Sequence, residues 1–396
     1  MRISLFVISF ILVVGVSAAY MSWRLLGPAR FGRGKALAVV GLIGSIVMAT
    51  PLTIILRSSG IENFLVDLVS LYGYIGLAFI SFVLTFLLMR DLLLLVSGLP
   101  RSVKRFLNRE SSSPQPPDTE RRRFLLNGLN TVILTGAGAM TGYGVAEARQ
   151  IPEIKTIRIP FDHLPSDLDG FRIVQLTDIH VGSTIKRPFV EGIVAAANTL
   201  SADIVAITGD LVDGSVPRLS ADVAPLSGLQ AAHGKFFVTG NHEYYSGADA
   251  WVEKVRSLGF TVLLNEHRLV QHGQGRLLIA GVTDYRGGRF APSHESNPFQ
   301  AMAGAPKADL SVLLAHQPRS IFDAAKAGFD LQISGHTHGG QFFPWNYIVF
   351  LTQPYVTGLH RHAGTRIYIS GGTGYWGPPV RLGSPSEITL IELIKA

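Results

Sequence analysis

Three long uncharged apolar segments within the first 90 residues constrain this chain more than any other feature. They cover residues 3–21, 36–56 and 68–89. Each has about 20 residues, and at 1.5 Å per residue a helix of that length crosses a hydrocarbon layer about 30 Å thick. Helices buried in a soluble core are the alternative, but three such segments so close together argue against it. We predict a three-helix transmembrane unit over residues 1–100, with residues 92–96 as an interfacial extension after the charged pair Arg90 and Asp91.

A fourth apolar segment, residues 124–145, is weaker because it contains Asn127, Asn130 and several glycines. Arg121-Arg122-Arg123-Phe124-Leu125 precedes it, which is similar to a twin-arginine export signal, and Ala146-Glu147-Ala148 has the small residues of a cleavage site. An ordinary membrane helix with a basic flank is the alternative. We predict a fourth transmembrane helix or signal anchor at 124–148, after a basic, Pro- and Ser-rich linker at 101–123.

Basic residues are distributed unevenly among the segments between these helices. Segments 22–35 and 101–123 contain four and seven Lys or Arg residues, whereas segment 57–67 contains one. By the positive-inside rule the two basic segments face the cytosol, and the fourth helix exits on the opposite side. We therefore predict a multi-pass protein of the cytoplasmic (inner) membrane with an extracytoplasmic C-terminal domain.

The net charge of +7 is concentrated largely in those loops. It sets topology and contacts anionic headgroups, so no nucleic-acid partner is expected. The sequence contains no cysteine, so any metal site must use nitrogen and oxygen ligands.

From about residue 152, short runs rich in β-branched residues alternate with polar turns and helical stretches. This alternation of short strands and helices predicts an α/β sandwich over residues 152–396. The predicted strands are 154–159, 172–176, 204–207, 236–238, 261–264, 277–282, 311–314, 331–333, 366–369 and 388–393. The predicted helices are 188–200, 248–258 and 320–327.

Residues able to bind a metal follow five of these strands directly. Ligands bind outside the carboxyl ends of strands in α/β sheets, so the position is informative. Ordinary turns supply Asp and Asn often but His rarely, and we interpret the five strand ends as one site. In chain order the candidate residues are Asp178, His180, Asp210, Asn241, His316, His336 and His338.

This ordered set resembles the calcineurin-like metallophosphoesterase superfamily. The matching motifs are Asp-x-His at 178–180, Gly-Asp-x-x-Asp at 209–213, Gly-Asn-His-Glu at 240–243, the lone His316, and Gly-His-x-His at 335–338. The resemblance covers about residues 155–394, and the membrane-anchored branch of YkuE and YaeI type is the most similar. It implies a four-layer α-β-β-α sandwich, here preceded by N-terminal transmembrane helices.

Physically, the candidate residues suit two metal ions that share one carboxylate. We predict Asp210 as the shared ligand. Asp178, His180 and His338 would complete the first site, and Asn241, His316 and His336 the second. A mixed nitrogen and oxygen set without sulfur favours Mn, Fe or Zn over Mg or Ca. Water between such ions becomes a hydroxide nucleophile near neutral pH.

His242 is expected to point away from Asn241, because neighbours in an extended chain face opposite ways. The resemblance implies that His242 contacts the substrate phosphate and acts as general acid or transition-state stabiliser. Asp213 and Glu243 are predicted to orient imidazoles or the turn. Arg381 is expected to be solvated, with a phosphate or headgroup contact as the alternative.

The prediction is a membrane-anchored, metal-dependent phosphoesterase that cleaves a phosphomonoester, phosphodiester or pyrophosphate bond. A non-catalytic metal-binding or signalling domain on a membrane bundle is the alternative. The aromatic segment 341–350, next to the site, suggests a lipid-linked or envelope substrate; a partly buried loop is the competing interpretation. The sequence leaves the oligomeric state open.

Overall fold

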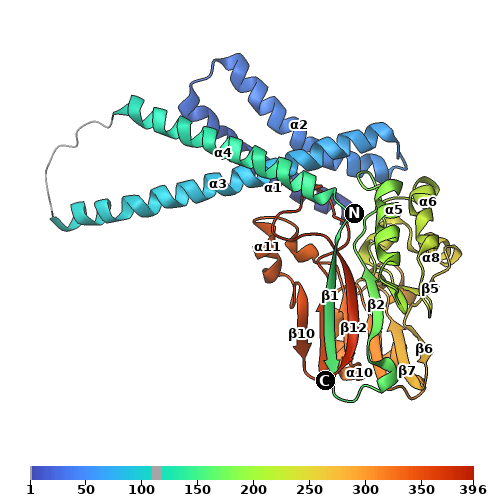
Figure 1. Cartoon of the computed structure of the whole chain (residues 1–396). Coiled ribbons are helices and arrows are strands. Elements are labelled where there is room, and N and C mark those ends of the chain that lie inside the picture. The colour runs from blue at the N-terminus through green and yellow to red at the C-terminus, as the bar shows by residue number, and fades with distance from the viewer. Residues whose placement is uncertain (1, 109–117) are drawn as a thin grey trace. The chain divides into compact units, whose positions relative to one another are not determined.

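The computed structural model describes residues 2–108 and 118–396. The chain divides into two compact units, Met1–Val145 and Ala146–Ala396, which are described separately below (Figure 1). Most of the Pro- and Ser-rich part of the predicted linker lies outside the described residues.

The first unit consists of four helices, all long and apolar enough to cross a membrane. They are α1 (Arg2–Ala29), α2 (Arg33–Ser58), α3 (Phe64–Asn108) and α4 (Thr119–Ala148). The helices extend beyond the apolar segments, so residues 101–108 and 119–123, predicted as linker, are helical instead. Lys and Arg are good helix formers, and helical hydrogen bonds satisfy the backbone beside a membrane.

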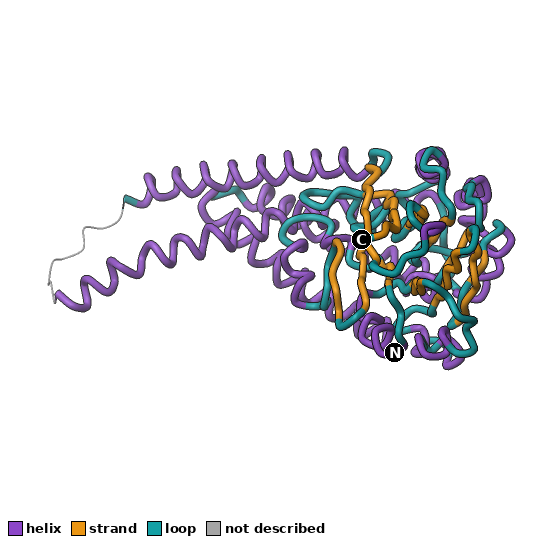
Figure 2. Tube along the Cα trace, turned by 60° about the horizontal axis from the view of Figure 1, so that its bottom comes forward, coloured by secondary structure: helices purple, strands orange, loops and turns teal. Residues whose placement is uncertain are grey.

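The second unit contains two six-stranded sheets, and in Figure 2 every described strand, drawn in orange, belongs to it. The first sheet has the order β1 (Glu153–Phe161), β12 (Glu387–Lys395), β2 (Phe171–Leu176), β3 (Ile204–Ile207), β4 (Lys235–Phe237) and β5 (Thr261–Val262). The second has the order β10 (Gly358–His362), β11 (Thr365–Ile369), β9 (Leu331–Ser334), β8 (Leu310–Leu314), β7 (Gly275–Gly281) and β6 (Glu266–His272).

The core lies between the two sheets and beneath the helices that cover them. Side chains such as Ile173 and Phe236 from the first sheet meet Ile279 and Val312 from the second. Helices α5 (Arg187–Asn198), α6 (Val216–Val223) and α8 (Ala248–Ser257) bury apolar residues against the first sheet. Helices α9 (Pro298–Met302) and α10 (Ile321–Ala327) cover the second. The predicted α-β-β-α sandwich is confirmed.

All ten predicted strands are present, but β6 and β10 were missed. Both are edge strands that pair antiparallel with a single neighbour. Their sequences are polar and half exposed, because an edge strand does not need the apolar pattern of a central one. Strands β2 to β5 run parallel, as do β7, β8, β9 and β11, so their carboxyl ends gather on one side of each sheet.

Candidate metal centre

The strand ends predicted to carry metal ligands meet where the two sheets face each other. The turn after β9 forms hydrogen bonds with residues that follow strands of both sheets. Gly335 N–H donates to the carbonyl of His316, after β8, and His336 N–H donates to the Asp178 carboxylate, after β2, at 2.9 and 3.0 Å. Gln175 on β2 also donates to the carbonyl of Ser334. All seven candidate residues therefore converge from five separate strand ends.

One group of side chains consists of Asp178, His180 and His338, all buried. The Nε2 atoms of the two histidines are 3.1 Å apart, and Asp178 Oδ1 lies 3.4 Å from His338 Nε2 and 4.0 Å from His180 Nε2. Three ligand atoms thus face one small volume, as a cation site requires.

A second group consists of Asp210, His316 and His336. His316 Nε2 lies 3.0 Å from Asp210 Oδ2 and 3.2 Å from His336 Nδ1. The same oxygen of Asp210 is 3.8 Å from His180 Nε2 in the first group. Asp210 therefore lies between the two groups, the position that a shared ligand would occupy.

The backbone at five of the seven candidates is left-handed, although none is glycine. The φ angles are +54° at Asp178 and His180, +51° at Asp210 and His338, and +74° at His336. Such conformations are uncommon outside glycine and persist only where the surroundings enforce them, most often at functional sites. The strain turns these side chains inward at the strand ends.

The electrostatics of the centre suit a bound cation. Burial, followed by the nearby charge of His316, lowers the pKa of His336 to about 3, and burial with His180 and Arg381 also lowers the pKa of His338. Both imidazoles are then neutral and can offer a lone pair to a metal. His316 differs: burial opposes its charging, but Asp210 raises its pKa to about 10.

Asn241 provides an independent test of whether the residues present could hold the predicted second metal ion. Its side-chain Oδ1 is buried and has no hydrogen-bond partner among the described residues. A buried polar atom without a partner is costly unless something else contacts it. A bound cation is one group that would satisfy this oxygen, which agrees with the prediction of Asn241 as a ligand of the second ion.

His242 begins helix α7 (Asn241–Ser246) together with Asn241. The extended geometry predicted for this pair is therefore wrong: the two side chains are about 100° apart around a helix. His242 Nε2 lies 3.9 Å from Asp210 Oδ2, and its Nδ1 is 2.5 Å from Asp213 Oδ1. Burial opposes protonation of His242, but Asp210 and Asp213 raise its pKa to about 9.

Comparisons with known proteins identify the family of this chain. The family described as calcineurin-like phosphoesterase matches residues 171–340. An uncharacterized metallophosphoesterase of Helicobacter pylori is 39% identical over 264 residues, which are 65% of this chain and 68% of that protein. The chain belongs to the calcineurin-like phosphoesterase family.

Two further relatives share the same domain. A transmembrane protein with metallophosphoesterase domain from Danio rerio is 38% identical over 262 residues, covering 64% of this chain but only 60% of the relative. The metallophosphoesterase YkuE of Bacillus subtilis is 29% identical over 285 residues, covering 69% of this chain and 97% of the relative. This chain is thus a hydrolase of the metallophosphoesterase family, whose members bind divalent metals, and its four long apolar helices are able to cross a membrane by their length and composition.

In this phosphoesterase, Glu243 fixes the turn that carries Asn241 and His242. The carboxylate is fully buried and accepts backbone N–H groups of Gly240, Leu211 and Asp210 at 2.6, 2.8 and 2.9 Å. As the third residue of α7 it reaches back to the N–H of Gly240 before the helix, which is the glutamate half of a capping box. These contacts agree with the prediction that Glu243 orients this turn.

Arg381 is buried, so the expectation of a solvated side chain is wrong. Its guanidinium donates to the carbonyls of His338, Gly371 and Ser384 at 2.8 to 3.1 Å and lies 3.2 Å from His338 Nδ1. The guanidinium supports the His338 turn from behind, and no local sequence signal indicates this.

Two aromatic residues beside His242 were also missed. The ring of Tyr245 lies 5.0 Å from that of His242, and the ring of Trp376 lies 5.4 Å from it. Tyr245 is 59% exposed and Trp376 is 50% exposed, so both rings lie at the surface beside His242. Trp376 is more than a hundred residues away in sequence, so only the fold brings it to the site.

Proposed function

We propose that this chain hydrolyses a phosphomonoester, phosphodiester or pyrophosphate bond at two metal ions, while its N-terminal helices hold it in the membrane. The observation that carries the proposal is the place of Asp210 between two groups of ligand side chains, and the unsatisfied buried oxygen of Asn241 supports it. Asp178, His180 and His338 would hold one ion, and Asn241, His316 and His336 the other.

When bound, two such cations would neutralise phosphate charge and lower the pKa of water. Mn, Fe or Zn fit a ligand set of nitrogen and oxygen better than Mg or Ca. Four histidines among seven candidates are the reason, since hard cations prefer oxygen.

His242 would supply the proton to the leaving group. Asp213 holds Nδ1, which leaves Nε2 facing the candidate ligands at 3.9 Å from Asp210. With a pKa of about 9, the imidazole carries its proton at neutral pH and can donate it to an alkoxide leaving group. The protonated ring would also stabilise charge on the phosphate oxygens.

A lipid-linked phosphate is the substrate class that the surface favours. The segment after the His338 turn forms helix α11 (Trp345–Ile348) and the turn that follows it. Tyr347, Phe350 and Leu351 expose 66%, 63% and 85% of their surface. An exposed apolar segment beside a catalytic site suits contact with a membrane or with an apolar substrate chain.

The decisive experiment measures hydrolysis by the purified full-length chain on soluble phosphodiesters, phosphomonoesters and phospholipids with added Mn²⁺. Asp210→Ala should abolish activity and reduce metal content, whereas a variant that keeps wild-type rates would exclude the two-metal mechanism with Asp210 as the shared ligand. A chain that binds metal but hydrolyses none of these substrates would favour the alternative of a non-catalytic metal-binding or signalling domain.

We also propose that the domain faces the outside of the cytoplasmic membrane, because the basic segments 22–35 and 101–123 favour the cytosol. Protease added to intact cells should then digest the phosphoesterase domain. Protection of the domain until the membrane is opened would place it on the cytosolic side.

A further inference from the structure

The membrane unit contains a charged cluster that phosphoester hydrolysis does not use. Arg90 on α3 is 6% exposed and donates to Asp91 Oδ1 at 2.8 and 3.0 Å and to the side chain of Asn130 on α4. Arg24 on α1 pairs with the other oxygen of Asp91, which also accepts the Tyr20 hydroxyl. One carboxylate thus faces two guanidinium groups.

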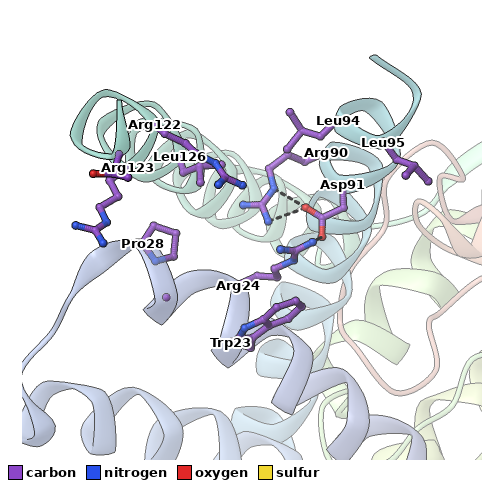
Figure 3. Close-up of a pocket in the computed structure, with 12 residues that line it drawn as sticks. Trp23, Arg24, Pro28, Arg90, Asp91, Leu94, Leu95, Arg122, Arg123 and Leu126 are labelled. Carbon is purple, nitrogen blue, oxygen red and sulfur yellow. Dashed lines mark hydrogen bonds and ion pairs between the residues drawn. The ribbon is translucent and has the colours of Figure 1, made fainter. Parts of the chain in front are cut away.

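An open cavity of about 510 Å³ lies beside this cluster, between α1, α3 and α4. Arg24, Arg90 and Asp91 line it, together with Arg122 and Arg123 from the start of α4. In Figure 3 the side chains of Arg24, Arg90 and Asp91 meet on one side of the cavity, while Arg122 and Arg123 come from the opposite helix.

The charge of the lining is strongly positive. Four arginines against one aspartate give a net charge of +3. Arg123 pairs with the exposed Glu120 at 3.0 Å, which is a weak surface contact. Among the described side chains, none pairs with the guanidinium of Arg122. Arg90 is buried, Arg24 and Arg123 are half-buried, and Arg122 is exposed. The planar fork of a guanidinium group matches the oxygens of a phosphate.

The depth of the cavity in the bilayer follows from α3. The uncharged stretch 68–89 of this helix lies between Asp67, which pairs with Arg57 at 3.2 Å, and Arg90. It is about 33 Å long at 1.5 Å per residue, close to the hydrocarbon thickness of about 30 Å. The two charged ends therefore fall at the two headgroup layers, and the cavity lies where lipid phosphates lie.

We propose that this cavity binds a phosphate group, carried by an anionic phospholipid whose acyl chains extend from the headgroup layer into the hydrocarbon layer, toward the uncharged stretch 68–89 of α3. Inorganic phosphate has the same recognition chemistry but lacks the acyl chains. The site is separate from the proposed hydrolytic centre, since all of its residues belong to the first unit.

The test uses the full-length chain in a neutral detergent and counts bound lipid by native mass spectrometry. Dioleoyl phosphatidic acid should bind at least about tenfold more tightly than dioleoyl phosphatidylcholine. The double variant Arg122→Gln, Arg123→Gln should weaken phosphatidic acid binding by about tenfold, and the double Lys variant should recover part of it. Arg121→Gln is the matched control, because Arg121 neighbours this pair on α4 without lining the cavity.

If Arg121→Gln weakened phosphatidic acid binding as much as the double variant does, a general basic surface would replace the proposed site. Equal affinity of the wild-type chain for phosphatidic acid and phosphatidylcholine would also overturn the proposal. A large excess of inorganic phosphate distinguishes the two sources of the anion. Lipid that stays bound supports the phospholipid, whereas complete displacement shows that the free anion suffices and overturns the role of the acyl chains. Size-exclusion chromatography shows that each variant remains folded.

Discussion

At the scale of single residues, the contact between His242 and Asp213 controls the proposed proton transfer. Asp213 touches His242 Nδ1 at 2.5 Å and also lies 3.3 Å from His180 Nδ1. It therefore orients one predicted ligand and the predicted acid at once. His242 is the member of this set whose function depends on carrying a proton, so its replacement should affect chemistry more than metal binding.

We expect His242→Asn to reduce kcat about 10²- to 10⁴-fold, because asparagine cannot protonate a leaving group. The loss should be larger for an alkyl phosphodiester than for a p-nitrophenyl ester, which needs no acid. Metal content per chain, measured by mass spectrometry, should be unchanged. Equal losses on both substrates would contradict a general-acid role.

The pH dependence tests the same residue through its neighbour. The protonated form of His242 is present below its pKa of about 9 and is lost as pH rises through that value, so activity should fall on the alkaline side. The Asp213 carboxylate helps to raise this pKa. Asp213→Asn should therefore move the alkaline limb of kcat to lower pH, compared at equal metal loading because bound cations also act on His242. If the alkaline limb stays at the same pH in Asp213→Asn, the limb reports the titration of a group other than His242.

At the scale of elements, the turn after β9 determines how closely the two sheets approach. A side chain at Gly335 would collide with the Asp178 carboxylate and the Thr177 hydroxyl. His336 N–H uses the same carboxylate as its hydrogen-bond acceptor. The glycine is therefore required by packing between strand ends rather than by its own φ angle.

Gly335→Ala should lower metal content per chain and destabilise the second unit by about 1–3 kcal/mol, because the methyl group has no free space. Gly364→Ala is the control, since a Cβ there meets nothing within 4 Å. Thermal unfolding and metal analysis of the two variants side by side measure the difference. A Gly335→Ala protein with full metal content would show that the turn can shift without cost.

At the scale of the whole molecule, the membrane helices and the exposed segment around α11 both favour a substrate at a lipid surface. Helices that span a membrane, as proposed, would restrict the enzyme to two dimensions, and the exposed segment supplies an apolar surface next to the site. An enzyme that hydrolyses a freely soluble phosphoester would need neither the membrane helices nor the exposed apolar segment.

Replacing Phe350 and Leu351 by Ser should lower kcat/KM about tenfold for a phospholipid in vesicles, since two large apolar contacts are lost. Hydrolysis of a soluble phosphodiester should change less than about twofold. The control is Phe299→Ser, because Phe299 is also half exposed but lies on α9. Equal effects on soluble and vesicle substrates would separate this segment from lipid recognition.

The predictable parts of the fold share a physical reason. The central strand β3 is entirely buried and consists of a continuous apolar run, so the polar residues that follow it stand out in the sequence. The edge strands β6 and β10 carry no such pattern. The burial of Arg381 was not predictable because its acceptors are backbone carbonyls of nearby turns at Gly371, Gly374 and Ser384 and of the distant turn at His338, which meet only in the folded domain.

The sequence by itself determined the four membrane-length helices, the α/β class of the domain and the identity of the candidate ligands. Each of these depends on local residue type, on hydrophobic length or on order along the chain. Only the tertiary structure decided that Asp210 lies between two groups, that Asn241 Oδ1 lacks a partner, and that Trp376 and Arg381 reach the site. These features depend on distances between segments far apart in sequence, which are fixed when the two sheets pack against each other.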